Sequence, residues 1–250
     1  MPLFFRKGKR ISLTPSGSLL FDHLKRSFKE IKQAENLLDS YSSLDIGQLR
    51  IGASDTICKH YLLEIFEEFH SSYPNIKLLI DNQPSPKTKE EVAGGELDLG
   101  FINHKPDAID PRFNYIDFYT LQEIFFTSQH YHELKDQTLS AEALLEYPFI
   151  SLKKHTSTRA FIEEIFKTYK LTIEPEVELI SIDLIADLVD IGLGIGFADQ
   201  KVITDHSSDK LFPLKTDFKR PKRQMSMISH SNAPLSTAAK AFIELINKNQ

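Results

Sequence analysis

The sequence predicts an α/β fold of two units behind a separate helical segment. After residue 47, short strand-like runs alternate with amphipathic helical segments, the pattern that is typical of parallel β-α-β units. A similar order of elements begins again near Glu123. With 250 residues, the chain is long enough for two compact units. In front of them, a continuous helical pattern runs from Pro15 to Tyr41.

The N-terminal segment combines a basic cluster with a hairpin pattern. Four basic residues fall within five positions: Arg6, Lys7, Lys9 and Arg10. A short β-like run and the helix-start signal Thr14-Pro15-Ser16 follow, so we expect a hairpin tip and then a helix. Residues 1–35 hold eight Lys or Arg against three Asp or Glu, while the whole chain carries a net charge of −5. A basic arm on an acidic body suggests an anionic partner for the arm, and a solvated helix face is the alternative.

Apolar residues in the long helical segment repeat at spacings that are mostly three or four. They form one stripe, made of Leu20, Leu24, Phe28, Ile31, Leu38 and Tyr41. A helix of roughly 40 Å needs a partner for such a stripe. A second copy in a coiled-coil-like pair is the economical partner, and packing on the chain's own body is the alternative. Residues 42–47 are interpreted as a hinge.

The remaining elements are predicted in order from apolar periodicity and from Gly and Pro positions. In the first unit we expect strands over 48–53, 76–81 and 96–102, a helix over 56–71, and a helix between Pro86 and Gly94. In the second unit we expect strands over 124–127, 149–152, 176–180 and 195–198, with helices over 140–145, 158–169 and 182–191. A strand over 224–229 and a helix over 236–247 close the chain.

Composition argues against several classes of protein. No apolar run approaches the roughly 20 residues that span a bilayer, and no export signal follows the basic start, so we expect a cytoplasmic protein. The single cysteine, Cys58, excludes an internal disulfide. It falls in the first turn of a predicted helix, where the helix dipole would lower its pKa, and burial as a small apolar residue is the alternative.

Two motifs that could carry chemistry are assigned to structure instead, and catalytic motifs are not found. The glycines of GLGIGF, residues 192–197, end a helix and open a strand, which is the reverse of a dinucleotide-binding fingerprint. His130 and His132 are interpreted as solvated loop residues, so no metal is expected. We find neither a nucleophile elbow nor a histidine with triad spacing. The sequence therefore predicts no enzyme and no cofactor.

Four stretches resemble the LysR-type transcriptional regulators. They are LFFRKGKRISLTPSGSLLFDHLKR, LRIGASD, GGELDLGF and LVDIGLGIGFA. In turn they are similar to the family's wing and linker-helix start, its first regulatory strand and turn, its third strand, and its late helix-glycine-strand element. They occur in the family's order over nearly the whole chain. The resemblance implies a two-lobed regulatory domain like the type II periplasmic binding proteins, behind a dimerising linker helix.

The resemblance also implies a division of the chain and a role for its basic arm. Residues 1–14 would be the remnant of a winged helix-turn-helix, 15–47 the linker helix and hinge, 48–121 with 226–250 lobe I, and 122–225 lobe II. In the family the recognition helix precedes the wing, where this sequence has Met1. Base edges are read by that helix, whereas the wing's basic residues reach phosphates. We therefore expect this chain alone to bind DNA weakly and without sequence preference.

An effector between the lobes is a further implication of the resemblance. We expect Ser54, Asp55 and Thr56 on the first wall, where a strand turns into a helix, and Thr156, Ser157 and Thr158 on the second. Helix N-termini suit a small anionic or strongly polar molecule, and simple capping is the alternative. Asn103 and Phe197 end strands that reach the rim of the cleft. Arg159 would add a clamp if it turned inward, or else serve the surface.

The sequence thus predicts the ligand-sensing and dimerisation part of a bacterial LysR-type regulator. Its expected partners are a small-molecule effector, DNA through the family's full architecture, and further copies of itself in a homodimer or homotetramer. A free-standing solute-binding protein of the same fold is the alternative, and a small-molecule enzyme is a third. The basic linker argues against a free-standing receptor, because such a protein has no use for it.

Overall fold

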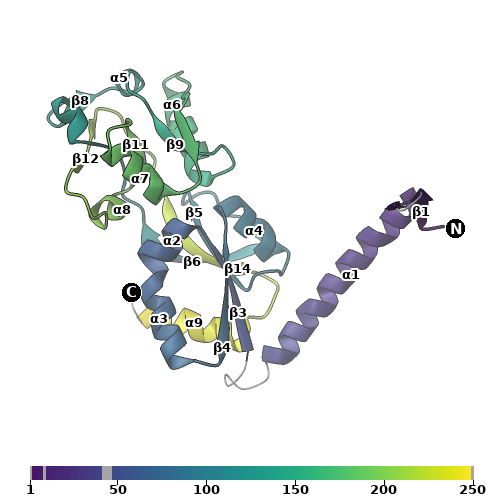
Figure 1. The fold of residues 1–250 in the computed structure, drawn as a ribbon. Coiled ribbons are helices and arrows are strands. Elements are labelled where there is room, and N and C mark those ends of the chain that lie inside the picture. Colours follow the sequence, from purple (N-terminus) through teal and green to yellow (C-terminus); the bar gives the residue numbers. More distant parts are fainter. Residues whose placement is uncertain (1, 8–9, 41–46, 249–250) are drawn as a thin grey trace.

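The computed structural model describes residues 2–7, 10–40 and 47–248, and Figure 1 shows a two-lobed body with a long helix extending from it. That helix, α1 (Pro15–Ser40), is preceded by a hairpin in which β1 (Phe4–Lys7) pairs antiparallel with β2 (Arg10–Leu13). Thr14 begins the helix, since its hydroxyl accepts a 2.9 Å hydrogen bond from Gly17 N. The predicted hairpin and helix are confirmed, whereas Lys9 and most of the predicted hinge lie outside the described residues.

One five-stranded sheet forms the first lobe, in the order β4-β3-β5-β14-β6. Its strands are β3 (Gly47–Ala53), β4 (Ile76–Asn82), β5 (Leu99–His104), β6 (Phe113–Thr120) and β14 (Gln224–His230). β3 runs parallel to β4 and β5, whereas β14 runs antiparallel to β5 and β6. Chain order leads from β6 into the second lobe and back through β14. The expected parallel units are therefore present, with one antiparallel strand, β14, inserted between β5 and β6. The strand β6 was not predicted.

Helices cover both faces of this sheet. They are α2 (Asp55–Ile57), the π-helical segment η1 (Cys58–Leu62), α3 (Leu63–Ser72), α4 (Ser85–Ala93) and α9 (Thr237–Lys248). The helix predicted over 56–71 is thus interrupted by one π-helical turn. In the core, the Phe242 ring of α9 lies 5.2 Å from Phe69 and 6.0 Å from Phe66 of α3, measured between centroids.

The second lobe contains smaller mixed sheets. Its strands are β7 (Glu123–Ser128), β8 (Thr138–Leu139), β9 (Ile150–Leu152), β10 (Val177–Leu179), β11 (Gly196–Asp199), β12 (Leu211–Pro213) and β13 (Lys215–Thr216). Its helices are η2 (Gln129–Leu134), α5 (Ala141–Leu144), α6 (Ser157–Thr168), α7 (Ile182–Asp190) and α8 (Gln200–Thr204). β9 is parallel to β10, and β7 is antiparallel to β11 and β12. The unpredicted elements, η2, β8, α8, β12 and β13, are too short to show periodicity.

The glycine-rich segment after α7 makes a tight turn into β11. Gly192 has φ +89° and Gly194 φ +154°, backbone conformations that favour glycine. A Cβ atom on Gly194 would lie 2.1 Å from the carbonyl oxygen of Pro148. The interpretation of GLGIGF as a helix end and turn is confirmed.

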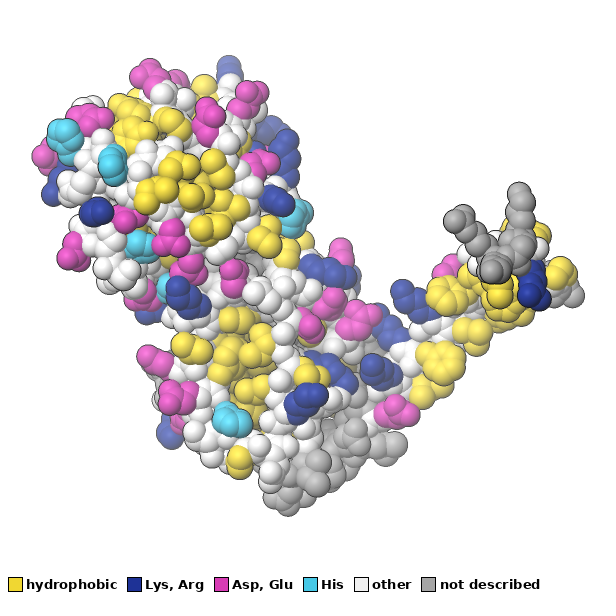
Figure 2. Space-filling model, in the orientation of Figure 1, with side chains coloured by type: hydrophobic (Ala, Val, Ile, Leu, Met, Phe, Trp, Pro, Cys, Tyr) yellow, Lys and Arg dark blue, Asp and Glu magenta, His cyan; other side chains and the backbone are white. Residues whose placement is uncertain are grey.

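Apolar side chains also gather outside the cores of the lobes. Figure 2 shows them along α1 and at its far end. The predicted stripe residues Leu20, Leu24, Phe28 and Ile31 are 40–67% exposed, whereas the side chain of Leu38 and the whole of Tyr41 lie outside the description. These exposures show that the described part of the body does not cover the stripe of α1.

In the described ranges, no helix is long and apolar enough to cross a membrane.

Candidate binding site

A cleft of about 300 Å³ lies between the two lobes. The first lobe contributes Ser54, Asp55, Thr56, Ile57, Tyr61, Asn82, Gln83, Pro84, Ser85 and Asn103. The second contributes Leu152, His155, Thr156, Ser157, Thr158, Ile180, Ile182, Ala198 and Asp199. Leu121, Glu123 and Met225 come from the segments that join the lobes. The lining thus combines polar side chains with apolar ones, such as Ile57, Leu152 and Ile182.

Three helical segments begin at the walls of the cleft, and side-chain caps explain two of these starts. Ser54 Oγ accepts from Ile57 N at 3.4 Å, and Thr156 Oγ1 accepts from Arg159 N at 3.2 Å. Both are N-cap bonds that satisfy otherwise free helix donors. At α4, Ser85 Oγ accepts from the backbone N–H of Asn103 at 3.1 Å. These walls therefore present helix starts from both lobes. Of the predicted hydroxyls, those of Ser54 and Thr156 are already used in capping.

Asn103 is the polar group that the protein leaves unsatisfied in the cleft. Among the described residues, its side-chain oxygen is buried and has no hydrogen-bond partner. Burying an unpaired amide oxygen costs about 1 to 3 kcal/mol. A hydrogen-bond donor on a bound molecule would recover that cost.

Carboxylates, not cations, supply the charge of the cleft. Asp55, Glu123 and Asp199 line it, and no Lys or Arg is among its described lining residues. Glu123 forms a buried ion pair with Arg223, whose Nε lies 2.9 Å from Glu123 Oε2. The guanidinium of Arg223 also donates to Thr158 Oγ1 at 3.0 Å. Glu123 is therefore neutralised within the protein.

Asp199 is held by several donors. It accepts hydrogen bonds from the Tyr61 hydroxyl at 2.8 Å, from Gln122 N at 2.6 Å and from Lys201 N at 2.9 Å. Burial, and then the charge of Asp199, raise the pKa of Tyr61 far above its ordinary value, so the phenol remains a donor. Tyr61 therefore joins the first lobe to the second at the cleft.

Most of the predicted effector residues meet in this cleft. They are Ser54, Asp55, Thr56, Asn103, Thr156, Ser157 and Thr158. Phe197 lies elsewhere, because its ring is 2% exposed and packs 4.8 Å from the Phe125 ring in the core of the second lobe. Its neighbours Ala198 and Asp199 line the cleft instead.

Arg159 is neither a clamp nor a surface residue. It is 1% exposed, it donates to Glu163 Oε1 at 2.9 Å and to the carbonyl oxygen of Leu152 at 3.2 Å, and it pairs with Glu178. The guanidinium is therefore fully engaged inside the second lobe.

Sequence reasoning missed several cleft residues, above all Tyr61, Ser85 and Asp199. Ser85 Oγ lies 3.5 Å from Ser157 Oγ of the opposite wall. The helix start at Pro84 and Ser85 is a signal of the same kind as the helix starts at Ser54 and Thr156, from which the site was predicted. Tyr61 and Asp199 are far apart in the sequence, and no local pattern links them.

Cys58 is partly buried. Burial, with a further contribution from the charge of Asp55, raises its pKa to about 11. The expectation that the helix dipole lowers this pKa is therefore wrong, and the alternative, burial as a small apolar residue, describes Cys58 better. No group of three or more His, Cys, Asp or Glu side chains in the described ranges could hold a metal ion.

Comparisons with known proteins agree with this architecture. Residues 42–250 match the family model described as "LysR substrate binding domain". A "Probable RuBisCO transcriptional regulator" of Trichormus variabilis is 27% identical over 252 residues, which cover 98% of this chain and 74% of that protein. The "HTH-type transcriptional activator CmpR" of a Synechocystis strain is 24% identical over 247 residues, covering 98% and 80%.

Two solved structures illustrate the likeness in fold. The regulatory domain of CcmR from Synechocystis PCC6803, in complex with 2-PG, has a TM-score of 0.71 at 22% identity, and the match covers 81% of this chain and 97% of that one. Full-length CbnR complexed with its target DNA has a TM-score of 0.61 at 14% identity, covering 99% and 84%. The predicted two-lobed α/β fold, like that of type II periplasmic binding proteins, is confirmed.

Proposed function

Because the chain belongs to the LysR substrate-binding domain family over residues 42–250, we propose that its cleft binds a small polar effector and that binding alters transcription through DNA contacts of the regulator. The observation that carries this proposal is Asn103, whose buried side-chain oxygen is unsatisfied in the cleft. Native proteins rarely leave such a group unpaired without a reason. A ligand with a hydroxyl or N–H group supplies the missing partner.

The cleft favours a small molecule that is neutral or carries little negative charge. Its volume of about 300 Å³ is at the small end of ligand pockets. Helix starts stabilise negative charge, whereas the carboxylates of Asp55 and Asp199 in the wall oppose it. The charge of Glu123 is offset by Arg223. We therefore rank hydroxy acids and other polar monoanions, with neutral polyols, above multiply charged anions. The 2-PG bound by the CcmR neighbour belongs in the first panel of candidates.

We further propose lobe I over 48–121 with 226–250 and lobe II over 122–225. Support comes from the two separate cores, although β14 already begins at Gln224 in the sheet of the first lobe. In the same model of function, Arg6, Lys7, Lys9 and Arg10 reach DNA phosphates, and the stripe of α1 joins two copies of the chain. The protein would act in the cytoplasm and without catalysis, as its regulator relatives suggest.

Calorimetry with a panel graded by charge tests the effector proposal. Asn103→Ala and Ser157→Ala should each lower the affinity for a confirmed effector up to about tenfold, as the loss of one hydrogen bond predicts. Ser151→Ala is the matched control, because Ser151 Oγ is also buried and unpaired among the described residues but does not line the cleft. Ser54 and Thr156 are unsuitable targets, since their loss removes a helix cap. Equal affinity of all variants for the effector would refute the site.

A further inference from the structure

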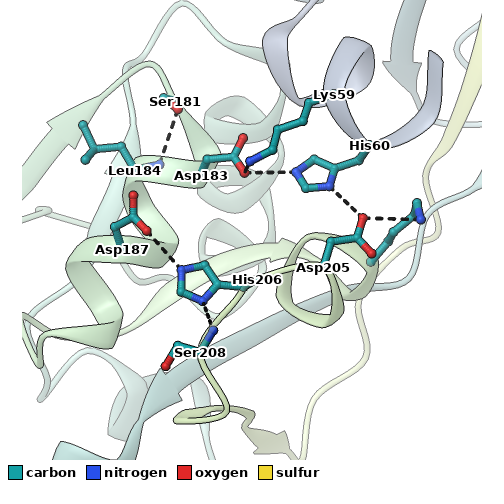
Figure 3. A network of polar contacts seen from close by, with 10 residues as sticks. Lys59, His60, Ser181, Asp183, Leu184, Asp187, Asp205, His206 and Ser208 are labelled. Atoms are coloured by element: carbon teal, nitrogen blue, oxygen red, sulfur yellow. Dashed lines mark hydrogen bonds and ion pairs between the residues drawn. The ribbon is translucent and has the colours of Figure 1, made fainter. Parts of the chain in front are cut away.

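Beside the cleft, a network of charged side chains connects the two lobes (Figure 3). From η1 of the first lobe, Lys59 Nζ lies 2.7 Å and His60 Nε2 lies 3.0 Å from Asp183 Oδ1, at the start of α7. His60 Nδ1 lies 2.8 Å from Asp205 Oδ2, at the end of α8. One imidazole of the first lobe therefore bridges two helices of the second.

Three successive side chains of the π-helical turn η1 (Cys58–Leu62) contact the second lobe. Lys59 and His60 contact Asp183, and Tyr61 contacts Asp199. Such π-helical turns occur frequently at functional sites.

Both ring nitrogens of His60 need a proton for these contacts. Each nitrogen faces a carboxylate, which accepts hydrogen bonds and cannot donate them when ionised. A neutral imidazole has one N–H group, so its other nitrogen would face a carboxylate lone pair. The side chain of His60 is only 3% exposed, which leaves little room for water to intervene. The geometry therefore fits the imidazolium ion.

The neighbouring charges keep both carboxylates ionised. Burial alone would raise the pKa of Asp183, but hydrogen bonds from Lys59 and His60 outweigh it and hold the pKa below its usual range. Burial would likewise raise the pKa of Asp205, but hydrogen bonds from His60 and Lys201 outweigh it and lower this pKa. Further titratable groups near His60 are Glu64 on its own helical run, Asp117 and Tyr119 on β6, and Asp187 on α7.

We propose that His60 is a pH-sensitive latch, which holds the second lobe against the first when its imidazole is protonated and releases it when the proton is lost. Lys59 keeps Asp183 paired, and Lys201 keeps a contact with Asp205 within the second lobe, so loss of the proton mainly removes the contact between His60 and Asp205. Each ring nitrogen faces a carboxylate, so the latch is complete when the imidazole carries both protons and weakens when a rise in pH removes one. The position of the lobes would thereby report pH as well as effector.

Pulsed EPR distances between the lobes test the latch in the full chain without effector, so the result does not depend on the proposed function. Labels on Lys77→Cys and Lys167→Cys, both exposed and in different lobes, in a Cys58→Ser background, report the lobe separation. Between about pH 5.5 and about pH 8.5, the ratio of long to short distances should rise at least about tenfold, since a charged hydrogen bond is lost. A distance distribution independent of pH would overturn the proposal.

Three variants separate the latch from general effects of pH. His60→Gln should abolish the pH dependence, and Asp205→Asn should keep the lobes together at high pH, because an amide can donate to the neutral imidazole. His206→Gln is the matched control, since His206 Nε2 pairs with Asp187 at 3.0 Å within the second lobe, and it should leave the pH dependence unchanged. A wild-type pH response in His60→Gln would refute the latch.

Side-chain NMR of the unlabelled protein gives an answer even if a variant fails to fold. Nitrogen–proton correlation spectra distinguish the imidazolium from either neutral tautomer. At the acidic end of the tested range, His60 should show two protonated nitrogens, because each faces a carboxylate. A neutral ring in the folded protein at that pH would contradict the latch.

Discussion

The hydroxyl of Tyr61 donates a 2.8 Å hydrogen bond to Asp199 Oδ1, and this contact joins the two lobes at the cleft. Asp199 in turn begins α8 by accepting from Lys201 N. The Tyr61 hydroxyl of the first lobe thus contacts the N-cap residue of a helix in the second lobe, next to the cleft in which we propose that the effector binds.

Tyr61→Phe should therefore destabilise the protein by about 1 to 2 kcal/mol, because a hydrogen bond to a carboxylate is lost while Asp199 keeps its backbone donors. Urea denaturation followed by circular dichroism measures the change. The control is Tyr73→Phe, whose ring packs 5.0 Å from Phe69, outside the interlobe contact. An equal effect of both substitutions would contradict the assignment of the cost to the Asp199 contact.

Arg223→Met should destabilise by about 3 to 5 kcal/mol, because it leaves Glu123 charged and unpaired inside the protein. The side chains of Arg223 and Glu123 are 3% and 9% exposed, and the guanidinium also lies 4.4 Å from the centre of the Phe161 ring. Thermal and urea unfolding measure this loss.

Arg112→Met removes an exposed partner of Asp110 and should change stability little. A loss as large as that of Arg223→Met would contradict the assignment of the cost to burial.

Cys58 should react slowly with thiol reagents in the folded protein. Its pKa of about 11 leaves very little thiolate near neutral pH, and the thiolate is the nucleophile. Alkylation rates measured from neutral to alkaline pH should therefore rise over the whole range. In urea, where burial is lost, the rate should level off near the ordinary thiol pKa. A folded-state plateau near pH 8.5 would contradict the raised pKa.

Negative charge at both Leu24 and Phe28 should yield monomers, if the exposed stripe of α1 joins two copies of the chain. Analytical ultracentrifugation measures the outcome. The charge swap Asp22→Lys with Arg26→Glu, on the opposite side of the same helix, is the control and should leave the assembly unchanged. An unchanged dimer after the Leu24 and Phe28 substitutions would move the interface to the α/β body.

The sequence by itself determined the elements and the helix starts of the cleft. Apolar periodicity is a local signal, so most predicted strands and helices lie within a few residues of the observed ones. Capping is also local, because a side chain meets a backbone N–H three residues ahead, and this made Ser54 and Thr156 visible as helix starts. The turn at Gly192 and Gly194 was also predicted from a local signal, because glycine favours the positive φ angles that a tight turn requires.

Only the tertiary structure decided which side chains face the cleft and which charges meet. Phe197 and Arg159 turn into the second lobe because partners from other elements, such as Phe125 and Glu178, lie there. Burial, which depends on the whole fold, raises the pKa of Cys58 against the local helix dipole. His60 lies 123 residues from Asp183 and 145 from Asp205 in the sequence. Contacts across such separations arise from packing of the two lobes, and no local pattern encodes them.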